Sequence, residues 1–89
     1  MFTGIIEDLG VVVSLEKEAT NLHLTVQSSL ASALKIDQSV SHNGVCLTVV
    51  DCNAASYTVT AIKETLDKTN LNSLTEGSIV NLERGLKLG

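Results

Sequence analysis

The sequence is 89 residues long with a mass of 9.4 kDa, and a chain this short cannot fill two cores, so we expect a single domain. Hydrophobic residues make up 44% of the chain but aromatic residues only 2%, which predicts an aliphatic core and argues against a surface that stacks nucleic-acid bases. The net charge of −4 argues against nucleic acid and against an anionic membrane as partners. No apolar run approaches the roughly 18 residues that cross a bilayer, and the N-terminus lacks the basic region of a signal peptide. We therefore expect a soluble, cytoplasmic protein.

Most of the chain has the residue pattern of β-strands. Residues 5–15 are rich in β-branched side chains and predict a long first strand, in which Gly10 indicates a bulge or a bend. Apolar and polar residues alternate at 22–27, 45–50 and 57–62, as is typical of half-buried strands. Residues 79–82 predict a shorter final strand.

Turn and helix signals separate these strands. Residues 29–34 and 70–74 predict two short helical segments, the first with Ser28 or Ser29 as its N-cap. Asn43-Gly44 is a strong hairpin signal, residues 51–56 predict a polar turn, and Glu76-Gly77 precedes the final strand. Five or six strands joined by tight turns in so short a chain favour a small antiparallel barrel over an open sheet.

The cysteines and histidines give no sign of a disulfide or a metal site. Cys46 and Cys52 lie in one strand-like stretch, which would hold their Cα atoms roughly 20 Å apart if it stays extended. We therefore expect two free thiols, as in a reducing compartment. Together with His23 and His42, their spacing matches no zinc pattern, so we expect no metal.

Two features could carry chemistry, and each has a plainer interpretation. Cys46 and His42 flank the predicted hairpin turn, where an imidazolium would lower the pKa of the thiol; the alternative, which we favour, is an exposed turn histidine beside a small strand residue. Cys46, Thr48 and Val50 share one strand face, and Thr58, Thr60 and Ile62 share the corresponding face of the next strand. Small hydroxyls among apolar groups suit a neutral heterocycle, although the high β-propensity of threonine explains them equally simply.

Three segments of the chain closely resemble the riboflavin synthase family, in the order and spacing of its N-terminal barrel. They are Met1-Phe2-Thr3-Gly4-Ile5-Ile6, the block Ser41-His42-Asn43-Gly44-Val45-Cys46-Leu47-Thr48-Val49, and Lys63-Glu64-Thr65-Leu66 with Thr69-Asn70-Leu71. The resemblance covers essentially the whole chain. It implies a six-stranded antiparallel Greek-key barrel with one or two short helices, which in the family is followed by a similar second barrel and a C-terminal helix in a trimer.

The resemblance also implies a reaction. Family members dismutate two molecules of 6,7-dimethyl-8-ribityllumazine to riboflavin and 5-amino-6-ribitylaminouracil, with no metal and no separate cofactor. Each active site lies between the N-terminal barrel of one subunit and the C-terminal barrel of another. The implied substrate-binding residues of this chain are Gly4, Ile5, Ile6, Cys46, Leu47, Thr48, Thr60, Ala61, Ile62, Lys63, Glu64 and Thr65. Ser39 and Cys46 match positions close to the reacting carbons, so they are the candidate catalytic residues.

The chain departs from the family pattern in two ways. Val45 stands where some members carry a second cysteine, and the second barrel and C-terminal helix are absent from residues 1–89. The segment 84–89 looks like the start of a linker at which the chain was cut. We therefore expect a single lumazine- or riboflavin-binding barrel with little turnover, which can pair with a second copy. The alternatives are a lumazine-carrying protein of the same fold and a generic flavin-reductase-like or translation-factor-like barrel.

Overall fold

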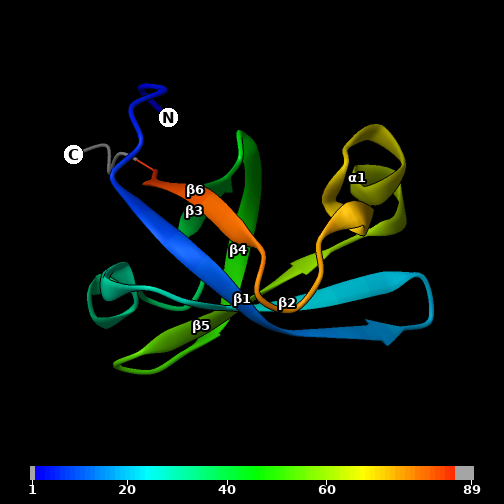
Figure 1. The fold of residues 1–89 in the computed structure, drawn as a ribbon, viewed down its shortest axis with the longest axis horizontal. Helices are drawn as coiled ribbons and strands as arrows, with labels where there is room; N and C mark the ends of the chain where they lie inside the picture. Colours follow the sequence, from blue (N-terminus) through cyan, green and yellow to red (C-terminus); the bar gives the residue numbers. More distant parts are fainter. Residues whose placement is uncertain (1, 86–89) are drawn as a thin grey trace.

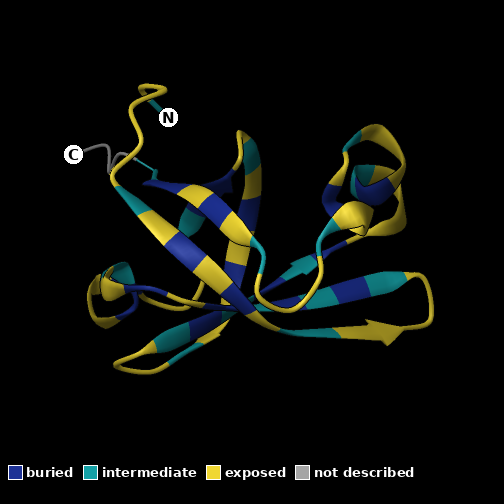
Figure 2. Cartoon of the chain, viewed as in Figure 1, coloured by how far each residue is buried: buried dark blue, intermediate teal, exposed yellow. Residues whose placement is uncertain are grey.

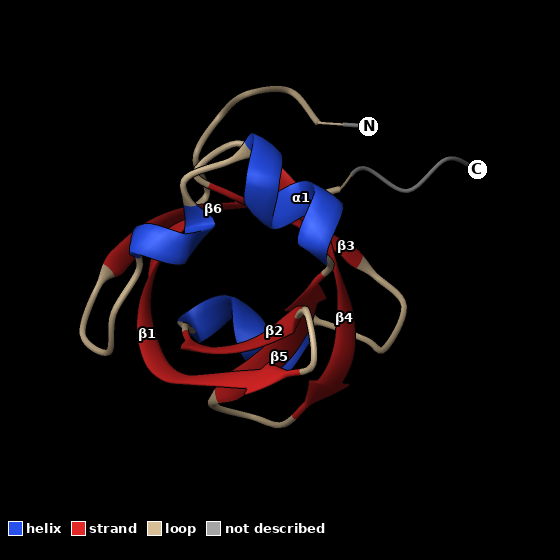
Figure 3. Cartoon of the chain, turned by 90° about the vertical axis from the view of Figure 1, so that its right-hand side faces the viewer, coloured by secondary structure: helices blue, strands red, loops and turns tan. Residues whose placement is uncertain are grey.

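Six antiparallel strands close into a barrel in the order β1-β2-β5-β4-β3-β6 (Figures 1 and 3). The computed structural model describes residues 2–85. The strands are β1 (Asp8–Glu18), β2 (Asn21–Gln27), β3 (Ser39–His42), β4 (Val45–Cys52), β5 (Ser56–Ala61) and β6 (Ile79–Arg84). Because β3, β4 and β5 are sequential neighbours and β6 returns to pair with β3, four of the strands form a Greek key. The predicted barrel is confirmed.

The core is aliphatic, as the composition predicts, and it follows from strand alternation. Inward side chains of β2 and β5 are buried at every second residue, which gives the banded colouring of the strands in Figure 2. Two short segments add to this core: η1 (Ser29–Ala33) contributes Ala31, and α1 (Lys63–Lys68) contributes Leu66. They lie on opposite sides of the barrel in Figure 1.

The first strand differs from its prediction in start and shape. It begins at Asp8, so Ile5 and Ile6 precede it, and its register shifts between Val12 and Ser14 rather than at Gly10. Gly10 instead permits close packing, because a Cβ there would lie 2.5 Å from Cγ1 of Val26. The irregularity therefore lies between Val12 and Ser14 and not at Gly10, where close packing explains the glycine.

The helical segments are partly as predicted. Residues 29–34 and 70–74 contain the 3-10 segments η1 and η2 (Leu71–Ser73), and the Ser28 hydroxyl caps η1 by accepting from the Leu30 amide at 3.1 Å. The sequence analysis did not predict α1 at Lys63–Lys68. No helix among residues 2–85 is long and apolar enough to cross a membrane.

The Asn43-Gly44 hairpin is confirmed, but its neighbour His42 is not exposed. Asn43 and Gly44 have φ of 50° and 88°, as a two-residue turn between β3 and β4 requires. His42 is 0% exposed, and its Nε2 lies 2.8 Å from the Tyr57 hydroxyl inside the barrel. The side chain points inward because it continues the inward face of β3 after Val40, so the predicted exposed turn histidine is wrong.

Candidate functional site

A row of outward-facing residues crosses three neighbouring strands. Glu83 of β6 pairs in register with Ser41 of β3, and Ser41 pairs with Cys46 of β4. Two residues further along the same strands, Ser39 of β3 pairs with Thr48 of β4. Since paired residues of antiparallel strands project to the same side, Ser39, Cys46 and Thr48 share one outer surface, which we call the β3–β4 face.

Cys46 forms a reactive pair neither with His42 nor with Cys52. Cys46 is exposed and Cys52 is half-buried, and both thiols are free. The His42 ring lies inside the barrel, whereas Cys46 projects outward, so the Cys46–His42 pairing considered from the sequence is wrong as well. Among residues 2–85 no cluster of three His, Cys, Asp or Glu side chains could hold a metal ion.

The segment before β1, residues 2–7, lies against β6, and we call it the N-terminal arm. The Thr3 amide and hydroxyl both donate to one carboxylate oxygen of Glu83 at 2.6 Å, and the Gly4 amide donates to the other at 3.0 Å. The Thr3 hydroxyl bond, together with the two amide bonds, holds the pKa of Glu83 below its usual value. Gly4 has φ of 82°, which turns the arm at this point.

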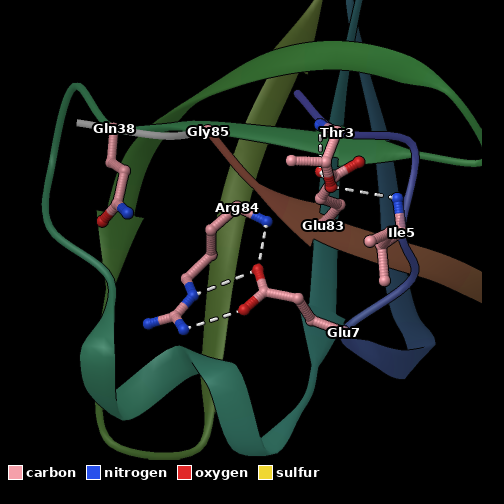
Figure 4. Close-up of a pocket in the computed structure, with 7 residues that line it drawn as sticks. All are labelled: Thr3, Ile5, Glu7, Gln38, Glu83, Arg84 and Gly85. Atoms are coloured by element: carbon pink, nitrogen blue, oxygen red, sulfur yellow. Dashed lines mark hydrogen bonds and ion pairs between the residues drawn. The ribbon is translucent and has the colours of Figure 1, made fainter. Parts of the chain in front are cut away.

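Two recesses flank the arm. One, of about 440 Å³, is lined by residues that include Phe2, Gly4, Ile6 and Ser41. The other, of about 380 Å³, is shown in Figure 4 and is lined by Thr3, Ile5, Glu7, Gln38, Glu83, Arg84 and Gly85. Both volumes fall in the range of small-molecule sites.

Gly85, directly after β6, lies close both to the arm and to the candidate residue Ser39. The Gly85 amide donates to the Ser39 carbonyl at 2.9 Å, and a Cβ on Gly85 would lie 3.5 Å from Ser39 Cβ and 3.6 Å from Phe2 Cε1. The Phe2 ring, Gly85 and Ser39 are therefore neighbours. The N-terminal arm and the β3–β4 face therefore adjoin at Gly85.

The structure brings part of the predicted set together here. Gly4 and Ile6 line one recess and Ile5 lines the other, while Cys46 and Thr48 lie on the adjoining face. Ile5 and Ile6 are 68% and 55% exposed, so they offer apolar surface to a ligand. Leu47 is different, because its side chain is 5% exposed and packs in the core, which leaves only its backbone for binding.

The second predicted group lies at the end of β5 and in α1. Val49 of β4 pairs with Val59 of β5. Thr48 and Thr60, which are adjacent to this pair, therefore lie side by side on the outer surface. The Thr60 hydroxyl, however, is bonded to His23 Nδ1 at 2.8 Å. Ala61 is buried, Ile62 is 52% exposed, and Thr65 is half-buried and accepts through its carbonyl from the Thr69 hydroxyl.

Lys63 and Glu64 are engaged within α1. Lys63 pairs with Asp67 at 2.7 Å and Glu64 with Lys68 at 2.8 Å, both exposed pairs of little energetic weight. Neither residue lines the recesses beside the arm. Their role in binding stays a prediction.

The sequence analysis missed the charged residues of the site. Glu7 of the arm and Arg84 of β6 form an ion pair at 2.9 Å, and Glu83 anchors the arm. The sequence contained one signal for them, the pair Glu83-Arg84 directly after the predicted final strand. If that strand continues, one of the two side chains projects from each of its faces.

The fold and the site are those of a small closed antiparallel β-barrel with two recesses beside an N-terminal arm. Comparison with known families identifies which one: the model of the lumazine binding domain matches residues 3–85, and the chain belongs to that family.

Riboflavin synthases are among the similar curated proteins. The chain is 42% identical to the riboflavin synthase of Bacillus subtilis over 87 residues, covering 97% of this chain and 40% of the relative. It is 44% identical to that of Buchnera aphidicola subsp. Schizaphis graminum over 92 residues, covering 100% of this chain and 44% of the relative. The chain therefore spans less than half the length of these relatives.

Solved structures share the fold. LumP complexed with 6,7-dimethyl-8-(1'-D-ribityl) lumazine superposes with a TM-score of 0.88 at 23% identity, covering 100% of this chain and 50% of that chain. The riboflavin complex of LumP gives a TM-score of 0.86 at 24% identity, covering 100% and 51%. The flavin mononucleotide complex gives 0.86 at 23%, covering 94% and 49%.

Proposed function

We propose that this chain binds 6,7-dimethyl-8-ribityllumazine and riboflavin on the β3–β4 face, beside the N-terminal arm. The observation that carries the proposal is the register Glu83–Ser41–Cys46, which joins the anchored arm to the face that holds Ser39 and Thr48. Family membership supports the ligand class.

The chemistry of this surface suits a flat, neutral ring with polar edges. Ile5 and Ile6 supply apolar contact, and the hydroxyls of Ser39 and Thr48 can donate to or accept from the ring edge. The side chains of Leu47 and Ala61 are buried, so these two residues would contact the ligand through their backbone groups. The exposed side chain of Ile62 extends the apolar wall toward α1.

We further propose that residues 1–89 are one barrel of a riboflavin synthase. In that enzyme two lumazines react, and Ser39 and Cys46 would lie beside the reacting carbons of the one held here. A reaction between two rings requires both to be held in register, which a second barrel provides. Alone, this chain would bind ligand with little or no turnover, and a homodimer would imitate the paired barrels without their asymmetry.

The second candidate function is that of a carrier, which holds a lumazine or flavin without converting it. We consider the carrier function because LumP complexed with 6,7-dimethyl-8-(1'-D-ribityl) lumazine shares this fold, with a TM-score of 0.88. The two functions differ in one outcome, namely riboflavin formation from lumazine once a second barrel is present.

The test is a fluorescence titration of this chain with 6,7-dimethyl-8-ribityllumazine, recording riboflavin formation in the same cuvette. We expect saturable binding at micromolar ligand, and Thr48→Val should weaken it by about tenfold because one hydrogen bond to the ring is lost. Thr20→Val, which changes an exposed threonine in the turn between β1 and β2, is the matched control. Absence of binding, or equal affinities for the two variants, would contradict the proposal.

A further inference from the structure

A second row of outward-facing polar residues crosses five strands of the barrel. Glu16 of β1 pairs in register with His23 of β2, and His23 pairs with Thr60 of β5. Thr60 lies beside Thr48 of β4, which pairs with Ser39 of β3. The β3–β4 face therefore continues across β5 to a histidine on β2 that the proposed binding site does not include.

Both ring nitrogens of His23 are engaged. Nε2 lies 2.9 Å from Oε1 of Glu18, and Nδ1 lies 2.8 Å from the Thr60 hydroxyl. A carboxylate accepts hydrogen bonds and cannot donate them, so in the neutral ring Nε2 carries the proton and Nδ1 accepts from the Thr60 hydroxyl. Glu18 thereby selects the tautomer of His23, and His23 sets the direction in which Thr60 donates.

The direction of this bond determines what Thr60 offers to a ligand. A threonine hydroxyl has one hydrogen and two lone pairs. The hydrogen is donated to His23 of β2, which lies on the opposite side of β5 from β4, so only lone pairs remain for a ligand on the β3–β4 face. The neighbouring pair on the same two strands has no fixed direction, because the hydroxyls of Thr25 and Thr58 lie 2.9 Å apart and either can donate.

We propose that His23 is a positioning residue, which holds the Thr60 hydroxyl as a hydrogen-bond acceptor for the ring N–H of a bound lumazine or flavin. This inference rests on the proposed binding of these ligands on the β3–β4 face. Their pyrimidinedione ring carries one N–H between two carbonyl groups, and an oxygen whose hydrogen is donated elsewhere pairs with the N–H and not with the carbonyls. Donation to His23 also makes the Thr60 oxygen a stronger acceptor, because successive hydrogen bonds polarise one another.

The test compares riboflavin with a derivative methylated at that ring nitrogen, by fluorescence titration at about pH 8.5, above the range in which histidine side chains ordinarily change charge. Wild-type chain should bind riboflavin at least about tenfold more tightly than the derivative. Thr60→Val removes the accepting oxygen and should narrow this ratio by about tenfold. His23→Phe keeps a planar ring but frees the Thr60 hydroxyl to rotate, so it should narrow the ratio by about threefold.

Two glutamates of β1 provide a matched control and a spectroscopic readout. Glu18→Ala removes the acceptor of Nε2, so the ¹⁵N shifts of the His23 ring should change from the Nε2–H tautomer to a mixture of both, and the ratio should narrow as in His23→Phe. Glu16→Ala removes the same charge from the register partner of His23 while the Glu18 bond stays, and it should change neither the shifts nor the ratio.

Equal ratios in wild type, His23→Phe and Glu18→Ala, with riboflavin binding retained, would overturn this inference alone. An Nδ1–H tautomer of His23 in wild type would also overturn it. Failure of wild-type chain to bind riboflavin at all would overturn the proposed function as well.

Discussion

The buried histidine predicts a steep loss of stability in mild acid. Burial lowers the pKa of His42 from 6.5 to about 4, while backbone groups of Val40 and Val45 oppose the change only in part. The ring is fully enclosed, its Nε2 is bonded to Tyr57, and its Nδ1 has no hydrogen-bond partner among residues 2–85. The protonated ring is therefore strongly disfavoured in the folded state.

The sign and size of the effect follow from proton linkage. Below pH 6.5, His42 binds a proton in the unfolded chain but stays neutral in the folded chain. The stability of the fold therefore decreases as the pH falls, until the pKa of about 4 in the folded state is reached. The slope is about 1.4 kcal/mol per pH unit at most, which gives a loss of roughly 3 kcal/mol over the whole window. Between pH 6.5 and 5, above the range of ordinary carboxyl groups, we expect about 2 kcal/mol.

Urea unfolding followed by circular dichroism at pH 7, 6 and 5 measures this loss. His42→Gln removes the titrating ring and keeps a side chain able to hydrogen-bond to Tyr57, so its stability should change little between pH 6.5 and 5. His23→Gln removes the other histidine, which is half-buried, and should retain the wild-type slope. An equally steep slope in His42→Gln would refute the reasoning.

Three further predictions concern the arm, the core and the thiol. Glu83→Gln should speed amide hydrogen exchange at Gly4 by about tenfold, measured by NMR; unchanged exchange would mean that the carboxylate does not hold the arm. Gly10→Ala should destabilise the barrel by about 1–3 kcal/mol in urea, because the added Cβ would lie 2.5 Å from Val26; a loss below about 0.5 kcal/mol would contradict this packing. Cys46→Ser should leave ligand affinity within about tenfold but reduce turnover in a two-barrel protein, and full turnover would leave the thiol without a chemical role.

Strands with clear alternation were predictable from sequence. Residues 22–27 and 57–62 each place an apolar side chain inward at every second position, so strand and face follow from the same pattern. The helix α1 gave no such signal, because its six residues contain a single buried side chain, Leu66. The strand β6 was predicted to end at Leu82, since Glu83 and Arg84 lack alternating polarity, yet pairing with β3 extends it to Arg84.

Only those parts of the candidate site whose residues lie close together in the sequence were predictable. Cys46 and Thr48 were placed on one face because every second side chain of a strand projects to the same side. His42 was misplaced since its buried partner, Tyr57, lies on β5, and local pattern does not show that contact. The anchoring of Thr3 by Glu83 joins residues 80 positions apart, so only closure of the barrel reveals it.

The measurement that tests the central claim most directly is an NMR titration of the isotopically labelled chain with 6,7-dimethyl-8-ribityllumazine. We predict that the largest amide shifts gather at Gly4 of the arm and at Ser39, Cys46 and Thr48 of the β3–β4 face. These residues are far apart in sequence but adjoin on the outer surface of the barrel. Shifts centred on η1 or on the turn between β1 and β2, or no saturable shifts at all, would contradict the account.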